Sequence, residues 1–278
     1  MKKNKFLFCI GLLLTVATIV NAQSVTWISS TEGNVWQKSK VKLQSKSEQN
    51  PVLQVDGTEN GVAFKNWGTT FNELCWDALG LLTRTEQDEI LYNIFSPQGD
   101  LRITRGRISM GANDYARSWY SCDEVEGDFE LRYFNINRDK QTIIPFIRAA
   151  QKYNPNLTFW ISPWCPPSWM KINGDYPVLS SPFNSLSEKQ NYLLYGATGG
   201  QVDENEMKLT GARDGVFPRQ LATTDFMIQD PRYLQTYADY FCRFIDAYKE
   251  QGIPIDMVMY QNEAYSYTPY PGCAWTAT

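Results

Sequence analysis

The chain has 278 residues, of which 43% are hydrophobic and 20% charged, so a packed globular core is expected and disordered, collagen-like and coiled-coil chains are excluded. The formal net charge of −4 argues against nucleic acid as a partner. The absence of histidine excludes Ser-His-Asp and Cys-His nucleophile systems and His-ligated zinc. Acid and base chemistry must therefore come from Asp, Glu, Lys, Tyr or Cys.

Residues 1–22 resemble a cleaved export signal. Basic residues precede the apolar run Phe6–Val20, and the small residue Ala22 ends the segment. The run is short for a membrane span, so we expect no stable membrane insertion after cleavage, with a retained anchor as the alternative. Cys9 has no small-residue lead-in of the lipoprotein kind. The sequence therefore predicts a secreted or periplasmic protein.

Residues 23–60 are predicted to hold short strands of an accessory β domain, because Trp27, Trp36, Val41 and Leu43 alternate with polar residues. A second, larger domain is expected over residues 61–278.

The larger domain alternates strand-type and helix-type segments. A short strand within 64–71 precedes a helix over 73–82, and Thr85 with Asp88 resembles a capping box that opens the next helix. The pattern then predicts strands over 101–110, 157–161 and 255–260, and helices over 139–153 and, capped by Asp230-Pro231, up to Gly252. Residues 173–220 are polar, without a sustained period, and are expected to be a large loop.

Strand-helix alternation predicts a parallel sheet, either in a closed (β/α)8 barrel or in an open doubly wound sheet. Neither GxGxxG nor GxxxxGK[ST] occurs, which argues against an open nucleotide-binding sheet. Each predicted strand instead ends in polar or aromatic residues, as barrel enzymes require at the carboxyl ends of their strands. We therefore predict a (β/α)8 TIM barrel, with about the first four β/α units present in this sequence.

The strongest candidate for chemistry is Glu263 at the end of the last predicted strand. Burial and a nearby second carboxylate would raise the pKa of such a group and suit it to general acid work. Asn262 beside it could bind a substrate hydroxyl. The alternative is a structural Glu that caps a neighbouring helix.

Aromatic residues are numerous in the predicted strand-end loops, where sugar rings could stack on them. For each residue alone, core packing is the alternative. The set is Trp67, Trp119, Trp164, Trp169, Tyr265, Tyr267 and Trp275.

The cysteines after residue 22 are odd in number and match no metal or CxxC spacing. At most two disulfides could form among them, and no metal site is predicted.

Four blocks resemble glycoside hydrolase family 30, the glucosylceramidase-like group. They are Trp67-Gly68-Thr69-Thr70-Phe71-Asn72-Glu73, Arg107-Ile108-Ser109-Met110-Gly111-Ala112-Asn113-Asp114-Tyr115, Ser162-Pro163-Trp164-Cys165-Pro166-Pro167-Ser168-Trp169-Met170-Lys171 and Gln261-Asn262-Glu263. They occur in family order. Two departures, Ala264 after the Glu in place of the common Pro, and Glu73 where some relatives have Asp, concern subfamily and substrate.

The resemblance implies a (β/α)8 barrel with a β-sandwich companion and retaining hydrolysis of β-glycosides. It implies that Glu263 is the acid/base residue and Asn262 the partner of the sugar 2-hydroxyl. Substrate contacts are expected from Glu73, Asp114, Trp164, Arg107, Trp67 and Trp169, with Arg107 as a charge near the nucleophile. The substrate would be an oligosaccharide, a polysaccharide or a glycolipid, and no cofactor or metal is expected.

In this family the nucleophile follows the seventh strand, and no residue of this sequence inherits that role. We therefore expect the 278 residues to be a fragment that is inactive alone. A non-catalytic carbohydrate-binding module is the main alternative, and a barrel enzyme that uses Lys or Tyr chemistry is a second one.

Overall fold

The computed structural model describes residues 24–42, 61, 63–186, 225–264 and 268–275. The chain divides into two compact units between Ala63 and Phe64. The predicted export signal and most of the predicted large loop lie outside the described residues.

The first unit contains a two-stranded antiparallel ribbon. Strand β1 (Ser24–Thr31) pairs with β2 (Asn34–Lys42), with Val25 opposite Val41 and Trp27 opposite Ser39. The described part of the predicted accessory segment is thus β structure.

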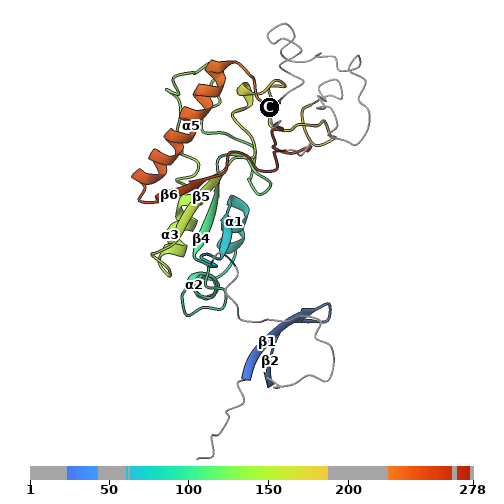
Figure 1. Cartoon of the computed structure of the whole chain (residues 1–278), viewed down its shortest axis with the longest axis vertical. Helices are drawn as coiled ribbons and strands as arrows, with labels where there is room; N and C mark the ends of the chain where they lie inside the picture. Colours follow the sequence, from blue (N-terminus) through green and yellow to red (C-terminus); the bar gives the residue numbers. More distant parts are fainter. Residues whose placement is uncertain (1–23, 43–60, 62, 187–224, 265–267, 276–278) are drawn as a thin grey trace, which may run out of the picture. The chain divides into compact units, whose positions relative to one another are not determined.

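The second unit is built on four parallel strands in the order β3-β4-β5-β6 (Figure 1). They are β3 (Gly68–Phe71), β4 (Arg105–Ser109), β5 (Thr158–Ser162) and β6 (Ile255–Val258). A doubly wound sheet reverses its strand order at a switch point, whereas a barrel adds each strand beside the previous one. The observed order is that of consecutive units of a β/α barrel.

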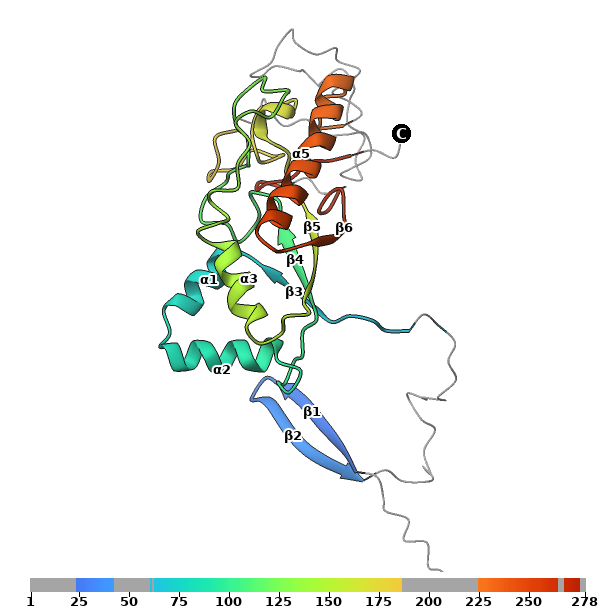
Figure 2. The same cartoon turned by 90° about the vertical axis from the view of Figure 1, so that its left-hand side faces the viewer.

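Helices fill the connections between these strands, as predicted. Helices α1 (Glu73–Gly80) and α2 (Arg84–Phe95) follow β3, α3 (Ile143–Gln151) follows β4, and α5 (Pro231–Glu250) precedes β6. Figure 2 shows α1, α2 and α3 together on one side of the sheet. Among the described helices, none is both long and apolar enough to cross a membrane.

Local sequence explains the helix ends. Asp230 caps α5 by accepting a hydrogen bond from the Arg232 amide at 2.8 Å, with Pro231 in the first turn, as predicted. The predicted capping box of α2 was misplaced by two residues. Thr83, not Thr85, has the extended backbone of a cap, and its side chain and that of Glu86 satisfy each other's backbone amides.

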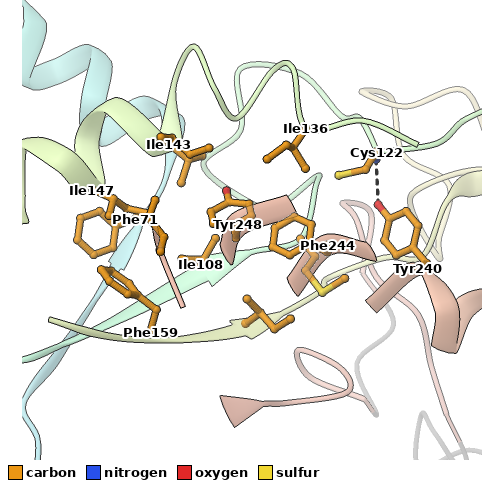
Figure 3. Packing of buried hydrophobic residues seen from close by; sticks show 14 of the residues in the cluster. Phe71, Ile108, Cys122, Ile136, Ile143, Ile147, Phe159, Tyr240, Phe244 and Tyr248 are labelled. Carbon is orange, nitrogen blue, oxygen red and sulfur yellow. Dashed lines mark hydrogen bonds between the residues drawn. The ribbon is translucent and has the colours of Figure 1, made fainter. Parts of the chain in front are cut away.

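The core lies between the sheet and its helices (Figure 3). Phe71, Ile108 and Phe159 are fully buried on the helix-facing side, and Phe71 packs edge-on against Phe146 of α3. Gly106 separates two of these rings. A Cβ at this position would lie 2.5 Å from Phe71 and 3.0 Å from Phe159, so only glycine fits.

The opposite face of the sheet carries a different set of side chains. Successive strand residues point to opposite faces, and the register aligns Thr70, Arg107 and Trp160 in one row across three strands. In a closed barrel this face lines the interior. Arg107 therefore lies on the face of the sheet that would line the barrel interior, close to the carboxyl end of β4.

Candidate active site

The carboxyl ends of β4, β5 and β6 meet around Arg107. Its Nη2 donates hydrogen bonds to Asn262 Oδ1 at 2.7 Å and to Ser162 Oγ at 3.2 Å. The guanidinium carbon lies 4.0 Å from the centre of the Trp164 ring and 5.0 Å from that of Trp160. Three strand ends therefore share one cation, and the hydrogen bonds and ring contacts fix its position.

Two carboxylates act on Arg107 electrostatically. Burial lowers the pKa of Arg107, while the negative charges of Asp114 and Glu263 oppose that shift. The cluster thus brings the predicted residues Arg107, Asp114, Trp164, Asn262 and Glu263 into one region.

Arg107 determines which end of the Asn262 amide is free. A guanidinium has only donors, so the atom that receives its bond must be the amide oxygen. The N–H groups of Asn262 therefore form the end of the amide that can donate to a ligand hydroxyl.

Trp164 is buried rather than open, with 6% of its surface exposed. One face of its ring is covered by Arg107, and its indole Nε1 donates to Asp114 Oδ2 at 3.3 Å. Asp114 itself is exposed. In this arrangement Trp164 orients a cation and a carboxylate, and the stacking role predicted from the sequence remains a prediction.

Glu263 is exposed, so the described residues do not provide the burial that the sequence argument invoked. Its backbone has a φ of 49°, a left-handed conformation that is uncommon for a residue other than glycine. The flanking backbone is held by bonds from the Asn262 amide to Pro163 O and from the Trp275 amide to Ala264 O, both 2.8 Å long. Such constrained backbone is concentrated at functional sites.

Two residues near the site had no assigned role in the sequence argument. Gln261 is buried and joins two aromatic segments, since its Nε2 donates to Trp164 O at 2.6 Å and its Oε1 accepts from Trp275 Nε1 at 3.2 Å. Burial, with the charges of Glu263 and Asp114, raises the pKa of Tyr270. The sequence signal for Gln261 is its place in the Gln-Asn-Glu block, and that for Tyr270 is an aromatic residue after the last strand.

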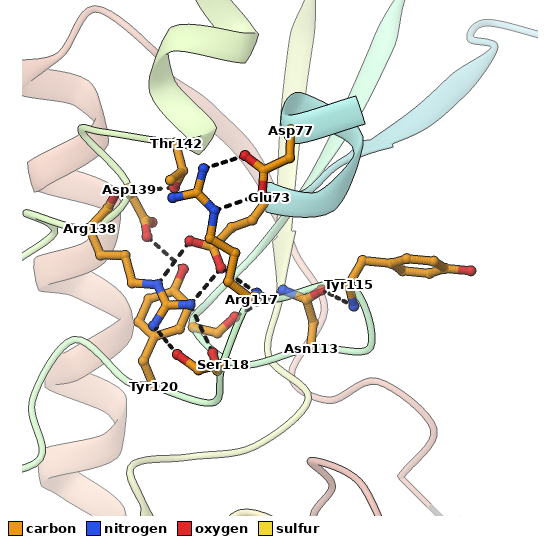
Figure 4. Close-up of polar contacts among 11 residues, drawn as sticks. Glu73, Asp77, Asn113, Tyr115, Arg117, Ser118, Tyr120, Arg138, Asp139 and Thr142 are labelled. Atoms are coloured by element: carbon orange, nitrogen blue, oxygen red, sulfur yellow. Dashed lines mark hydrogen bonds and ion pairs between the residues drawn. The ribbon is translucent and has the colours of Figure 1, made fainter. Parts of the chain in front are cut away.

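Glu73 lies in a separate polar cluster behind the loop that follows β4 (Figure 4). It is fully buried, and its carboxylate accepts hydrogen bonds from Arg138 and from the Arg117 amide. Burial alone would raise the pKa of Glu73, but these bonds and the charge of Arg138 bring it below its ordinary value. Its carboxylate is thus already engaged by protein groups.

Trp67 and Trp169, the other tryptophans expected to contact the substrate, do not join the cluster around Arg107. Trp67 immediately precedes β3 and so lies at the amino end of that strand, and its expected place in a carboxyl-end loop is wrong. Trp169 is 2% exposed, donates from Nε1 to Asp123 O at 3.0 Å and packs edge-on against Phe129. Within the described residues Trp169 is a packing residue.

No group of three or more Cys, Asp or Glu residues in the described part of the chain is arranged to hold a metal ion. At the cluster around Arg107 the described residues supply two exposed carboxylates, an oriented amide and a fixed cation.

Comparison with known proteins supports the family resemblance. Residues 64–181 match the glycosyl hydrolase family 30 TIM-barrel domain. A Caenorhabditis elegans protein provisionally named glucosylceramidase 4 is 27% identical over 250 residues, which cover 89% of this chain and 40% of that protein. The endo-1,6-β-D-glucanase neg1 of Aspergillus fumigatus is 26% identical over 231 residues, covering 81% and 40%.

Solved structures support the same fold. An endo-β-1,6-glucanase aligns with a TM-score of 0.52 at 22% identity, covering 74% of this chain and 36% of that one. SrfJ from Salmonella typhimurium aligns with a TM-score of 0.57 at 17% identity, covering 90% and 46%. The chain spans about 40% of the length of the curated relatives named above. The predicted barrel fold and the family resemblance are confirmed.

Proposed function

We propose that the complete gene product is an exported, retaining β-glycosidase of glycosyl hydrolase family 30, because residues 64–181 match the TIM-barrel domain of that family. The observation that carries the proposal is the cluster in which Arg107 fixes Asn262 beside Glu263 at the carboxyl ends of the strands. Barrel enzymes assemble their catalytic residues at this end of the sheet.

In the proposed reaction Glu263 protonates the oxygen of the leaving group, and a second carboxylate attacks the anomeric carbon. Glu263 then removes a proton from the water that hydrolyses the glycosyl-enzyme intermediate. Exposure of Glu263 on the described face gives it access to both the leaving group and water. The Asn262 N–H groups would donate to the sugar 2-hydroxyl, where hydrogen bonds strengthen in the transition state.

We assign the second carboxylate to none of the 278 residues, because the resemblance puts the nucleophile after a later strand than β6. A retaining enzyme needs two carboxyl groups about 5–5.5 Å apart. Residues 1–278 alone are therefore proposed not to hydrolyse glycosides.

The proposed substrate is a β-glucan or a related β-glycoside, and a glycolipid is the alternative. The relatives are named for both classes, as an endo-1,6-β-D-glucanase and a glucosylceramidase. No metal or cofactor takes part in this mechanism.

The test is to incubate the complete gene product with a panel of aryl β-glycosides and β-glucans and to follow the product anomer by NMR. The expected result is hydrolysis with retained configuration, abolished on poor substrates by Glu263→Gln. Sugar binding without any turnover would instead favour a carbohydrate-binding module. Inverted product would refute the double displacement.

Export rests on residues 1–22, which have the pattern of a cleaved signal. The complete gene product should fractionate with a periplasmic marker protein, and N-terminal sequencing should find Gln23 as the first residue of the mature protein. An uncut, cell-associated product would contradict this.

A further inference from the structure

An ion pair joins the buried Glu73 at the start of α1 to the half-buried Arg138, which lies in the segment before α3. Arg138 Nε donates to Glu73 Oε1 at 2.8 Å and Arg138 Nη2 donates to Oε2 at 2.6 Å, which is a two-point contact. Oε2 also accepts from the Arg117 amide at 2.8 Å. Glu73 is fully buried, so both carboxylate oxygens are committed to groups of the protein (Figure 4).

The same arginine holds the loop between β4 and α3. Arg138 Nη1 donates to Ser118 Oγ and Nη2 to Ser118 O, both at 2.9 Å. The guanidinium also lies 4.0 Å from the centre of the Tyr120 ring. Arg138 therefore connects Glu73 to two further points of this loop.

The loop in turn presents Asp114 to the candidate active site. Within the loop, the Ala112 amide donates to Tyr120 O at 2.7 Å and joins its two sides. The loop is also bound to the start of α1, where the Leu74 amide donates to Tyr115 O at 3.1 Å. At its exposed end Asp114 accepts from Trp164. The position of Asp114 thus depends on anchors in α1 and next to α3.

We propose that Glu73 is a positioning residue which, through its ion pair with Arg138, sets the loop that carries Asp114, and that Asp114 rather than Glu73 contacts the sugar. This inference rests on the proposed function. It differs from the resemblance, which implies that both carboxylates contact the substrate. Glu73 is fully buried with both oxygens bonded to protein groups, so a sugar hydroxyl could reach it only if the surrounding structure opened.

Deoxygenated substrates separate the two roles. A residue that binds one sugar hydroxyl loses its importance when that hydroxyl is removed, whereas a positioning residue does not. The experiment measures kcat/KM of the complete gene product for an aryl β-glycoside and its monodeoxy analogues. We expect Glu73→Gln and Arg138→Met each to lower kcat/KM by about 10- to 100-fold on every analogue, as misplacement of an active-site group does.

The double variant and a control sharpen the result. Glu73→Gln with Arg138→Met should be no worse than either change alone, because both break one pair. Asp114→Asn should lose its effect on one particular deoxy analogue. Glu130→Gln, which breaks the exposed pair between Glu130 and Arg132 outside residues 111–121, is the matched control and should leave kcat/KM unchanged.

A second readout is independent of activity. Amide hydrogen exchange of residues 111–121 should become faster in Arg138→Met, and the increase should be smaller in Arg138→Lys. The Lys variant is milder and replaces Arg138→Met if that protein does not fold. Exchange should stay at the wild-type rate in Glu130→Gln, whose pair with Arg132 lies outside this segment. The inference is overturned if the loss of kcat/KM in Glu73→Gln disappears on one particular deoxy analogue. It is also overturned if hydrogen exchange in this loop is unchanged by substitution of Arg138. Inactivity of the wild-type protein on all glycosides would refute the proposed function instead, while the exchange measurement still decides this inference.

Discussion

Arg107 and Asn262 are joined by a hydrogen bond of 2.7 Å although 155 positions separate them in the sequence. The bond runs from β4 to the segment after β6 and so passes over β5, whose Ser162 accepts a second bond from the same nitrogen. Because arginine can only donate, the contact sets the amide orientation next to Glu263. The chain thus brings the proposed acid, its neighbouring amide and a fixed charge to one place.

Substitution of Glu263 tests its proposed role as the acid. Glu263→Gln in the complete gene product should reduce kcat on alkyl or sugar leaving groups by about 10²–10⁴, the usual worth of general acid catalysis. The loss should be much smaller on dinitrophenyl glycosides, which leave without protonation. A series of leaving groups of rising pKa measures this, with Glu250→Gln at the exposed end of α5 as a control. Equal losses across the series would remove Glu263 from the acid role.

Two substitutions of Trp164 separate packing from binding. The side chain is nearly buried and its ring covers Arg107, so Trp164→Ala should destabilise the protein by about 3–5 kcal/mol, as other large core truncations do. Trp164→Phe keeps a ring over Arg107 but removes the donor to Asp114, and should lower sugar affinity with a smaller loss of stability. Urea unfolding and sugar titrations measure the two effects. If Trp164→Ala binds sugar poorly but unfolds like the wild type, Trp164 is an open platform, as the sequence argument assumed.

Local sequence patterns predicted the strands and helices of the barrel, but they could not predict contacts between residues far apart in the sequence. The Asp230-Pro231 cap was predicted to the residue because both signals are local. The α2 cap was misplaced because Thr83 with Glu86 and Thr85 with Asp88 fit the same spacing, and only the backbone at Thr83 decides between them.

The candidate site was predicted by residue type but not by environment. Motif resemblance indicated Glu73 and Asp114 as equivalent sugar contacts. The buried Glu73 is paired with Arg138, which lies 65 positions away and belongs to none of the quoted blocks. Burial and partner choice follow from strand register and loop course, which no single motif contains.

A methyl group at Gly106 should weaken the core. In Gly106→Ala the new Cβ would lie 2.5 Å from the Phe71 ring, and overpacking of this kind costs about 1–3 kcal/mol. Gly80→Ala is the matched control, because no atom lies within 4 Å of its Cβ and alanine favours a helix. Unfolding in urea should show opposite signs for the two changes. Combining Gly106→Ala with Phe71→Leu should recover part of the loss, and a neutral Gly106→Ala would contradict the packing described.

Asp139 should make stability depend on pH. It is fully buried, accepting hydrogen bonds from Tyr248 at 2.6 Å and Tyr120 at 2.7 Å, and burial raises its pKa from 3.8 to about 6. Because the folded state then holds this proton more tightly than the unfolded state, the stabilising contribution is complete below about pH 4 and is lost as pH rises through 6. The difference of about two pKa units corresponds to roughly 3 kcal/mol.

The pH effect of Asp139 has to be separated from that of Asp123, whose pKa burial also raises to about 6. Comparison of the wild type with Asp139→Asn isolates the first, because Asp123 contributes equally to both proteins. Free energies of unfolding measured between pH 4 and pH 8 should fall more steeply in the wild type than in Asp139→Asn, and the two curves should converge in slope above pH 7. A carboxyl resonance of Asp139 that titrates near 4, or parallel pH profiles for the two proteins, would show that the buried carboxyl is not held in its protonated form.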